Sequence, residues 1–100
     1  MEKLCPKFED AFEILGKRWT GLIIRSLQSG PKRFKDLEVM IPQLSARMLT
    51  ARLKELEEHH IISRTVSNST PVLIEYSLSE KGFDLHQAMD AVAQWAEKWN

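Results

Sequence analysis

The chain has 100 residues, 43% of them hydrophobic and 28% charged, with 14 basic and 14 acidic side chains. This length predicts a single domain, and the supply of aliphatic residues excludes a disordered chain. Because there is one cysteine and no long apolar run, the sequence excludes an internal disulfide, and we expect neither a transmembrane span nor a secretory signal in residues 1–6. A reducing cytoplasm fits such a chain best.

The neutral total hides an uneven distribution of charge. Residues 17–54 hold nine basic and two acidic side chains, whereas residues 1–16 carry a net charge of −2 and residues 55–100 a net charge of −5. A basic segment of this kind is typical of proteins that bind polyanions, although an ordinary mixed surface is the alternative.

Helical spacing of apolar residues predicts two N-terminal helices. The first spans about 6–15, with Pro6 in its first turn, where a missing N–H costs nothing, and Gly16 at its end. The second follows it and stops before Pro31. The residues that show this spacing are Phe8, Ala11, Phe12 and Leu15 on the first helix and Trp19, Leu22, Ile23, Ser26 and Leu27 on the second.

Two more helices are expected on either side of a short turn at residues 42–44. A third helix carries Phe34, Leu37 and Ile41 and ends near Pro42. Ser45 is typical of an N-cap and starts a fourth helix over about 46–60. The inward stripe of the fourth helix is expected at Leu49, Leu53, Leu56 and His60.

The period of the pattern then changes from helix to strand. Residues 61–66 and 72–78 predict a hairpin whose polar tip is formed by residues 67–71, and the second strand alternates as a half-buried strand does. Ser79 caps a last helix over about 80–99, with an apolar band at Leu85, Met89, Val92, Ala96 and Trp99.

This order predicts one mostly α-helical α+β domain over residues 1–100, with the layout of a winged helix-turn-helix. The helix-turn-helix covers about 34–60 and the wing about 61–78. Extra helices, at about 6–15 and 80–99, precede and follow them.

Five short motifs in this order make the chain similar to a known family. They are Cys5 with Pro6, residues 16–19, residues 30–34 with Leu37, Ser45 with Met48, Leu49, Leu53 and Leu56, and residues 76–79 with Gly82. The chain resembles the HxlR-type winged-helix transcriptional regulators, close to the YodB-like subgroup that senses quinones and oxidants through a thiol. The resemblance implies a homodimeric DNA-binding regulator, usually a repressor, whose first and last helices build the dimer and whose N-terminal cysteine is the sensor.

The fourth helix is the expected recognition helix, because residues in the first turns of such a helix reach base edges in the major groove. Arg47 can donate two hydrogen bonds to guanine, and Lys54, further along, suits phosphate. The expected contacts are Ser45, Arg47, Met48, Thr50, Ala51 and Lys54 on this helix, and Lys32, Arg33 and Lys35 for phosphates. The alternatives are an ordinary surface helix and, for Arg33, an ion pair within the fold. Lys17 and Arg18, expected at the start of the second helix, are further candidates.

The expected wing lacks the basic tip that suits a minor groove. Arg64 at its base is the nearest cation, and Leu73 stands where the family often has a basic residue. The tip residues Ser67, Asn68, Ser69 and Thr70 can still bond to phosphate or to a groove edge.

The last helix has more apolar residues than so thin a core can cover. Met89, Val92, Trp95 and Trp99 are therefore expected to join Phe8 and Phe12 in a two-fold interface, although the helix could instead pack on its own domain. Such a dimer would place two recognition helices about 34 Å apart, so that together they read an inverted repeat.

Cys5 is the candidate sensor. A thiolate reacts with electrophiles, and a position at the start of a helix near Lys3 and Lys7 favours it, whereas Glu2 and Glu9 oppose it. The expected product is an alkylated thiol, a mixed disulfide with a small thiol, or a Cys5–Cys5′ bridge between subunits, each of which could turn the two halves of the dimer. The alternative is that Cys5 is simply a small hydrophobic residue.

Other functions find less support in the residues. The sequence offers no nucleophile–base pair, phosphate loop or metal-ligand set, so we expect no enzyme, cofactor or metal, and His59, His60 and His86 suit helix-end or surface positions. Two alternatives stay open: a DNA-binding regulator gated by a small ligand, and a winged helix whose acidic flanks bind another protein.

Overall fold

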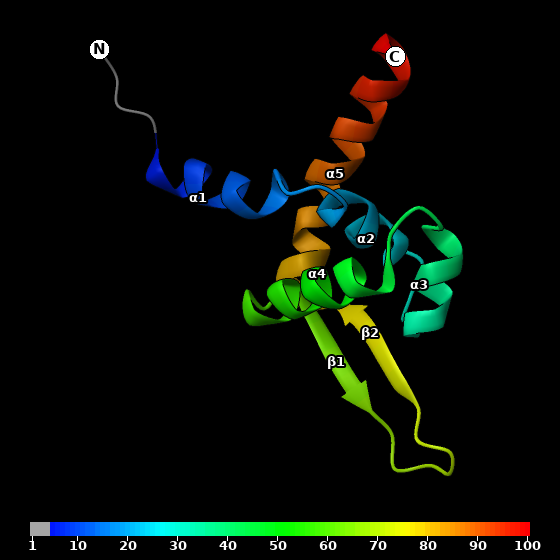
Figure 1. Ribbon diagram of the computed structural model, residues 1–100. Helices are drawn as coiled ribbons and strands as arrows, with labels where there is room; N and C mark the ends of the chain where they lie inside the picture. Colours follow the sequence, from blue (N-terminus) through cyan, green and yellow to red (C-terminus); the bar gives the residue numbers. More distant parts are fainter. Residues whose placement is uncertain (1–4) are drawn as a thin grey trace.

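The computed structural model describes residues 5–100 as five helices and one β-hairpin (Figure 1). This arrangement confirms the mostly helical α+β fold. The elements in chain order are α1 (Pro6–Leu15), α2 (Thr20–Ser26), α3 (Phe34–Met40), α4 (Ala46–Glu58), β1 (Ile62–Val66), β2 (Ile74–Leu78) and α5 (Glu80–Trp99).

The core lies where α2, α3 and α4 meet the base of the hairpin. Ile23 and Ile24 of α2, Leu37 of α3 and Leu49 of α4 have no exposed surface. Burying side chains of this size stabilises the fold by about 1.5–3 kcal/mol each. The other buried apolar residues are Ile14, Leu27, Ile41, Leu44, Leu53, Leu56, Ile61 and Ile62.

The second helix begins later than its apolar stripe predicts. Trp19 has a left-handed backbone, with φ of 80°, so α2 starts at Thr20 and Lys17 and Arg18 lie in the connection before it. Leu22 belongs to the helical stripe of this segment, but it is 51% exposed. Thr20, Ile23 and Ile24 occupy the buried face of α2, and Leu22 lies outside it.

Helix α4 has a well-defined start and a buried back. The Ser45 hydroxyl caps the helix by accepting a hydrogen bond from the backbone N–H of Met48, at 3.1 Å. The helix ends at Glu58, and the prediction that His60 continues the inward stripe is wrong. His60 has φ of 59°, and this left-handed residue turns the chain into β1 and leaves the imidazole exposed.

The hairpin is antiparallel, with Ile62 opposite Leu78 and Val66 opposite Ile74. Lys32 adds a third short pairing that the sequence did not predict, because its N–H and C=O exchange hydrogen bonds with Tyr76 at 2.9 and 2.8 Å. The connection before α3 is thereby fixed to β2.

Helix α5 is anchored to the body over its first half, as far as Asp90, and is mostly exposed beyond it. The Ser79 hydroxyl caps it by accepting from the N–H of Gly82. A side chain at Gly82 would overlap the carbonyl oxygen of Ile61, so the helix can approach β1 this closely only with glycine there. Further along, the Asp90 carboxylate accepts from Arg25 of α2 at 3.0 Å.

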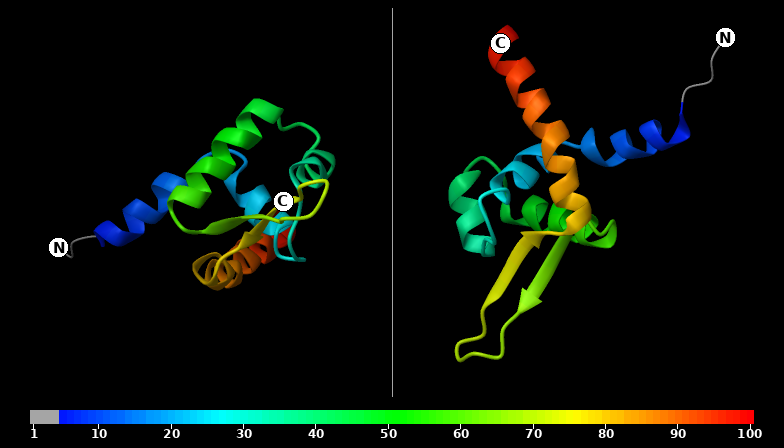
Figure 2. Two further views of the ribbon diagram at one scale, coloured as in Figure 1. Left: turned by 90° about the horizontal axis from the view of Figure 1, so that it is seen from below. Right: turned by 180° about the vertical axis from the view of Figure 1, so that it is seen from behind.

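Helices α1 and α5 project from the body and diverge from each other, on the side away from the tip of the hairpin (Figures 1 and 2). The accessible surface is 7704 Å², compared with about 5,800 Å² expected for a compact monomer of this mass. Both helices carry large apolar side chains that are exposed, among them Phe8, Phe12, Trp95 and Trp99. Within residues 5–100, no helix has both the length and the apolar character that crossing a membrane requires.

Candidate DNA interface

The outward face of α4 carries the residues expected to read DNA. Arg47, Thr50, Ala51 and Lys54 are exposed, and Met48 lies at the edge of the same face. The Thr50 hydroxyl donates to the Ala46 carbonyl at 2.8 Å, which leaves its lone pairs free to accept. Since Leu49, Leu53 and Leu56 hold the opposite face in the core, the whole polar face points outward.

The residues expected to meet phosphate differ in their freedom. Lys35 is exposed, whereas Lys32 is half-buried and its ammonium donates to the Gly30 carbonyl at 3.3 Å. The Arg33 side chain lies 3.7 Å from the Asp36 carboxylate, which is the ion pair considered as its alternative. Because both partners are largely exposed, this pair is weak and Arg33 can still turn to a phosphate.

The tip of the hairpin is built by its own hydroxyl groups. Ser67 and Ser69 share a hydrogen bond of 2.7 Å, Ser67 also accepts from the N–H of Leu73, and Ser69 donates to the Pro71 carbonyl. These two serines therefore shape the tip. Asn68 and Thr70, with Arg64 on β1, remain exposed for contacts outside the chain.

The connection between α1 and α2 is tied to α4 by an ionic cluster that the sequence analysis missed. The Glu55 carboxylate lies 2.7 Å from the Lys17 ammonium and 2.8 Å from the Arg52 guanidinium. Arg52 also donates through Nε to the Arg18 carbonyl at 3.0 Å. Only the spacing of Arg52 and Glu55, three residues apart on a helix, could have signalled part of this cluster.

These contacts shift the protonation of Glu55. The hydrogen bond from Lys17 holds the pKa of the Glu55 carboxyl below its usual value. Partial burial opposes this effect, and the positive charges of Lys17 and Arg52 reinforce it. Glu55 is therefore ionised at neutral pH and forms the centre of the cluster.

Intramolecular pairing also shows which cations are left for a ligand. Of the nine basic residues in 17–54, Lys17, Arg25, Arg33 and Arg52 have carboxylate partners within the described part of the chain. Arg47 and Lys54 have none there, and both lie on the outward face of α4.

The projecting helices expose the aromatic side chains expected in a dimer interface. Phe8 and Phe12 stack at 4.9 Å between ring centroids on α1, and both are more than half exposed. On α5, Trp95 is 61% exposed, and Val92 and Trp99 are similarly open. Met89 differs, because it is half-buried against the core of its own domain.

Cys5 occupies the N-cap position of α1, and its thiol is exposed. Its carbonyl accepts from the N–H of Phe8 at 3.0 Å. Phe8 and Phe12 follow Cys5 at helical spacing, so the thiol lies at the end of the exposed aromatic face. Lys3 and Glu2, considered as neighbours that influence the thiol, lie outside the described residues.

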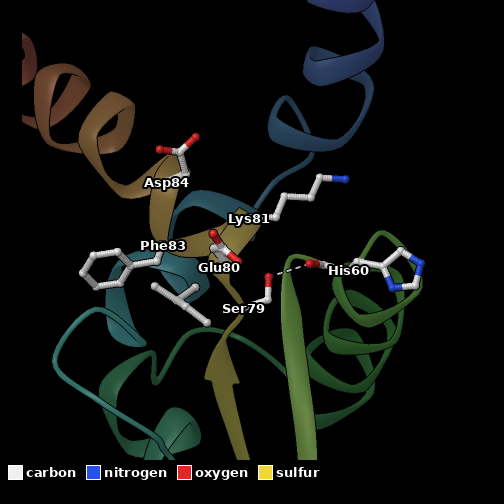
Figure 3. Close-up of a pocket in the computed structure, with 7 residues that line it drawn as sticks. His60, Ser79, Glu80, Lys81, Phe83 and Asp84 are labelled. Carbon is white, nitrogen blue, oxygen red and sulfur yellow. Dashed lines mark hydrogen bonds between the residues drawn. The ribbon is translucent and has the colours of Figure 1, made fainter.

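The histidines are not part of a metal-binding cluster within residues 5–100. Among residues 5–100, no group of three His, Cys, Asp or Glu side chains is placed to hold a metal ion. His60 lines a pocket where α5 begins, together with Ser79, Lys81, Phe83 and Asp84 (Figure 3). Here the Ser79 hydroxyl donates to the His60 carbonyl, which joins the start of α5 to the end of α4.

Comparison with known proteins shows the family. Residues 14–100 match the HxlR-like helix-turn-helix family. The chain belongs to this family. The HTH-type transcriptional regulator YodB of Bacillus subtilis (strain 168) is 49% identical over 96 residues, which cover 96% of this chain and 86% of YodB. The chain is thus a helix-turn-helix transcriptional regulator, a class of DNA-binding proteins and not of enzymes.

Solved structures of related regulators share the fold of this HxlR-like chain. The reduced form of YodB from B. subtilis is 48% identical and superposes with a TM-score of 0.88, covering 97% of this chain and 95% of that one. The quinone-bound form of YodB is 47% identical, with a TM-score of 0.82 and coverage of 95% and 100%. The oxidized form of the redox regulator HypR is 33% identical, with a TM-score of 0.89 and coverage of 96% and 98%.

The lowered pKa of Glu55 predicts how this HxlR-like regulator responds to acid. Such a carboxyl stabilises the fold above its unfolded-state pKa, and this contribution is lost as the pH falls through the folded-state pKa. Lys17→Met should therefore lower the free energy of unfolding at neutral pH by at most about 1 kcal/mol, because the pair is partly exposed. The difference from wild type should shrink below about pH 4.

Urea denaturation at a series of pH values measures this difference. Lys35→Met is the control, because Lys35 is exposed and has no carboxylate partner in residues 5–100. Its small effect should not depend on pH in the acid range. An effect of Lys17→Met that stays constant between neutral and acid pH would contradict the role given to Lys17.

Proposed function

We propose that the chain is a homodimeric repressor that reads an inverted-repeat operator through α4 and is released when Cys5 is modified. The observation that carries the proposal is the outward face of α4. Arg47 and Lys54 on this face have no carboxylate partner within residues 5–100, and the leucines of α4 are buried on the opposite face. In this proposal the domain acts as one winged-helix unit, with helix-turn-helix 34–60, wing 61–78 and dimer helices 6–15 and 80–99.

The composition of the α4 face suits the major groove of B-DNA. Arg47, in the first turn of the helix, has the forked donors that pair with O6 and N7 of guanine, and such a pair is worth about 1–3 kcal/mol of discrimination. Thr50 and Ala51 are small enough for the helix to approach the base edges, and Lys54 lies where the helix leaves the groove. Lys35 and Arg33 add phosphate contacts that fix the register on DNA.

The wing contributes in a different way from one with a basic tip. Asn68 and Thr70 at the tip are exposed polar groups that can bond to phosphate, and Arg64 offers a cation nearer to the base. Because the tip carries no cation, the wing adds less to the salt dependence of binding than α4 does.

The apolar faces of α1 and α5 support the homodimer. Five large side chains on these helices, Phe8, Phe12, Val92, Trp95 and Trp99, are each more than half exposed. A monomer rarely leaves a patch of this kind open to water. A two-fold axis through the patch would pair α1 and α5 of one chain with those of its partner and direct both copies of α4 toward one face of the DNA.

The position of Cys5 links chemistry to this dimer. The thiol is exposed at the end of the same aromatic face, and two related regulators are known in quinone-bound or oxidized form. In the reaction with a quinone, Sγ forms a bond to a ring carbon and the thiol proton passes to one carbonyl oxygen. The hydrogen of the attacked carbon then moves to the other oxygen, so the ring becomes a hydroquinone and no other reductant is needed. A bulky adduct at this point would separate the helices of the dimer and change the spacing of the two α4 helices.

Gating by a small ligand is the second candidate, and one groove favours it. The groove between α1 and α5 is lined by apolar residues that include Ile14, Leu85 and Ala88, together with charged residues that include Lys7 and Lys81. An apolar molecule bound there would act on the same two helices without using Cys5. The response of a cysteine variant separates the two mechanisms.

Substitutions on α4 should separate base reading from phosphate contact. Arg47→Met should weaken binding to the operator by about 1–3 kcal/mol and relax the preference for guanine at one position of each half-site. Lys54→Met should weaken binding to all duplexes alike and reduce the slope of log Kd against log salt by about one phosphate contact. Fluorescence anisotropy with operators selected from random DNA measures both effects and the number of chains bound.

The two α4 variants serve as controls for each other, because each removes one cation from the same face. Two chains per operator are expected. The proposal that α4 reads DNA would be contradicted if the wild-type Kd did not depend on DNA sequence and salt, or if Arg47→Met weakened binding to all duplexes equally.

Cys5→Ser should bind the operator as tightly as the reduced wild type but should keep its affinity after treatment with benzoquinone. The reason is that serine nearly preserves the shape of the side chain while its hydroxyl does not add to quinones. Anisotropy before and after treatment, with mass spectrometry of the adduct, measures the response. If Cys5→Ser is released as readily as wild type, Cys5 is not the sensor and the ligand-gated mechanism is favoured.

A further inference from the structure

Side chains fasten α4 to both of the helices that project from the domain. At its middle, Glu55 and Arg52 bond to the connection that follows α1, through the Lys17 ammonium and the Arg18 carbonyl. At its end, the His59 carbonyl accepts from the Lys81 ammonium of α5 at 2.8 Å, and the His60 carbonyl accepts from Ser79 (Figure 3).

The connection from α1 is bonded so that Lys17 follows the motion of that helix. The N–H of Gly16 donates to the Phe12 carbonyl at 2.9 Å, and the N–H of Lys17 donates to the Ile14 carbonyl at 3.2 Å. These bonds continue the last turn of α1 as far as Lys17. A rotation of α1 therefore moves the Lys17 ammonium relative to α4.

The next residues form a turn with a backbone conformation that a bulky side chain adopts at a cost. Trp19 has φ of 80°, and such a conformation persists where neighbouring groups hold it. One holding group belongs to the cluster, because Arg52 bonds to the Arg18 carbonyl. Another is the Arg18 guanidinium, which lies 4.5 Å from the centre of the Trp19 ring. The turn between α1 and α2 thus depends on a residue of α4.

We propose that Glu55 is a positioning residue that couples the orientation of α1 to that of α4 through Lys17 and Arg52. The inference rests on the proposed function, because it assigns the path by which a change at the N-terminus of α1 reaches the residues that bind DNA. Arg52 and Glu55 lie on α4 between its buried back and its outward face. When α1 turns, α4 must turn with it or the cluster must break.

Burial and charge make the cluster stronger than an isolated surface pair. The Arg52 side chain is only 16% exposed and bonds to both a carboxylate and a carbonyl, while each oxygen of Glu55 has a different cation. The lowered pKa of Glu55 agrees with this mutual support. Loss of one member leaves another partly buried charge without its partner, so the link is expected to fail as a unit.

Three variants test the proposal. Glu55→Gln and Lys17→Met break the link from opposite ends, one on α4 and one after α1. Glu58→Gln is the matched control, because Glu58 is one turn further along α4, is exposed and has no cation partner in the described part of the chain. It removes the same charge from the same helix, so it reproduces any general electrostatic effect on DNA binding.

Hydrogen exchange of the free, reduced proteins measures the link without DNA or quinone. Glu55→Gln and Lys17→Met should each raise amide exchange by about threefold or more both in residues 16–20 and in α4, whereas Glu58→Gln should change neither segment. Faster exchange confined to the segment that carries the substitution would overturn the proposal, because it would show two local effects and no coupling.

The release ratio, which is the operator Kd after quinone treatment divided by the Kd before it, measures the same link in function. It should match wild type in Glu58→Gln and should be smaller by about threefold to tenfold in Glu55→Gln and in Lys17→Met. The release ratio of the double variant should be no smaller than that of the more affected single variant, because both substitutions remove the same link.

A release ratio equal to wild type in both single variants would overturn the proposal, whatever their stability. If the wild type itself does not bind the operator, or is not released by quinone, the proposed function fails. The hydrogen-exchange comparison still decides in that case whether Glu55 couples the two helices.

Discussion

The structure depends on the burial of one face of α4. Leu49, Leu53 and Leu56 close the core against α2, α3 and the base of the hairpin, and they determine which face of α4 points outward. A rotation that exposed them would forfeit several kcal/mol of apolar burial. The opposite face, with Arg47 and Lys54, is therefore held outward with an accuracy that its own polar contacts could not provide. A helix that reads base edges needs this preorganisation, because a small error in its angle removes the bidentate contacts.

The same core leaves much of α1 and α5 exposed, and this exposed surface suits the dimer interface that we propose. A domain of this size has too little interior to bury two further amphipathic helices. In the dimer that we propose, a second copy covers the exposed aromatic side chains of α1 and of α5, and the two α4 helices acquire a fixed separation. Cys5 stands at the start of α1. In that dimer a reagent that modifies Cys5 would change the placement of the two α4 helices without touching the side chains that we expect to read DNA.

Much of the fold follows from local patterns in the sequence, and the reasons for the exceptions are physical. The inward stripe of α4 and its Ser45 cap could be predicted because apolar spacing and capping are properties of neighbouring residues. The exposed position of His60 could not be predicted, because α4 ends before it and a left-handed residue turns the chain there. The bonds between Glu55 and Lys17 join residues far apart in the chain, and no periodicity signals such a pair. The outward position of Arg47 followed from the stripe, but its freedom from an internal carboxylate is visible only in the folded chain.

Hydroxyl-radical footprinting of side chains, with and without operator DNA, tests most directly the claim that the outward face of α4 binds DNA. Met48 is the sensitive reporter, because methionine oxidises readily and its side chain lies on that face at 36% exposure. We predict that the operator protects Met48 and the peptide that carries Arg47 and Lys54, while oxidation of Trp95 and Trp99 on α5 stays unchanged. Protection of α5 with no change at Met48 would contradict the account and would place DNA, or another partner, on the opposite side of the molecule.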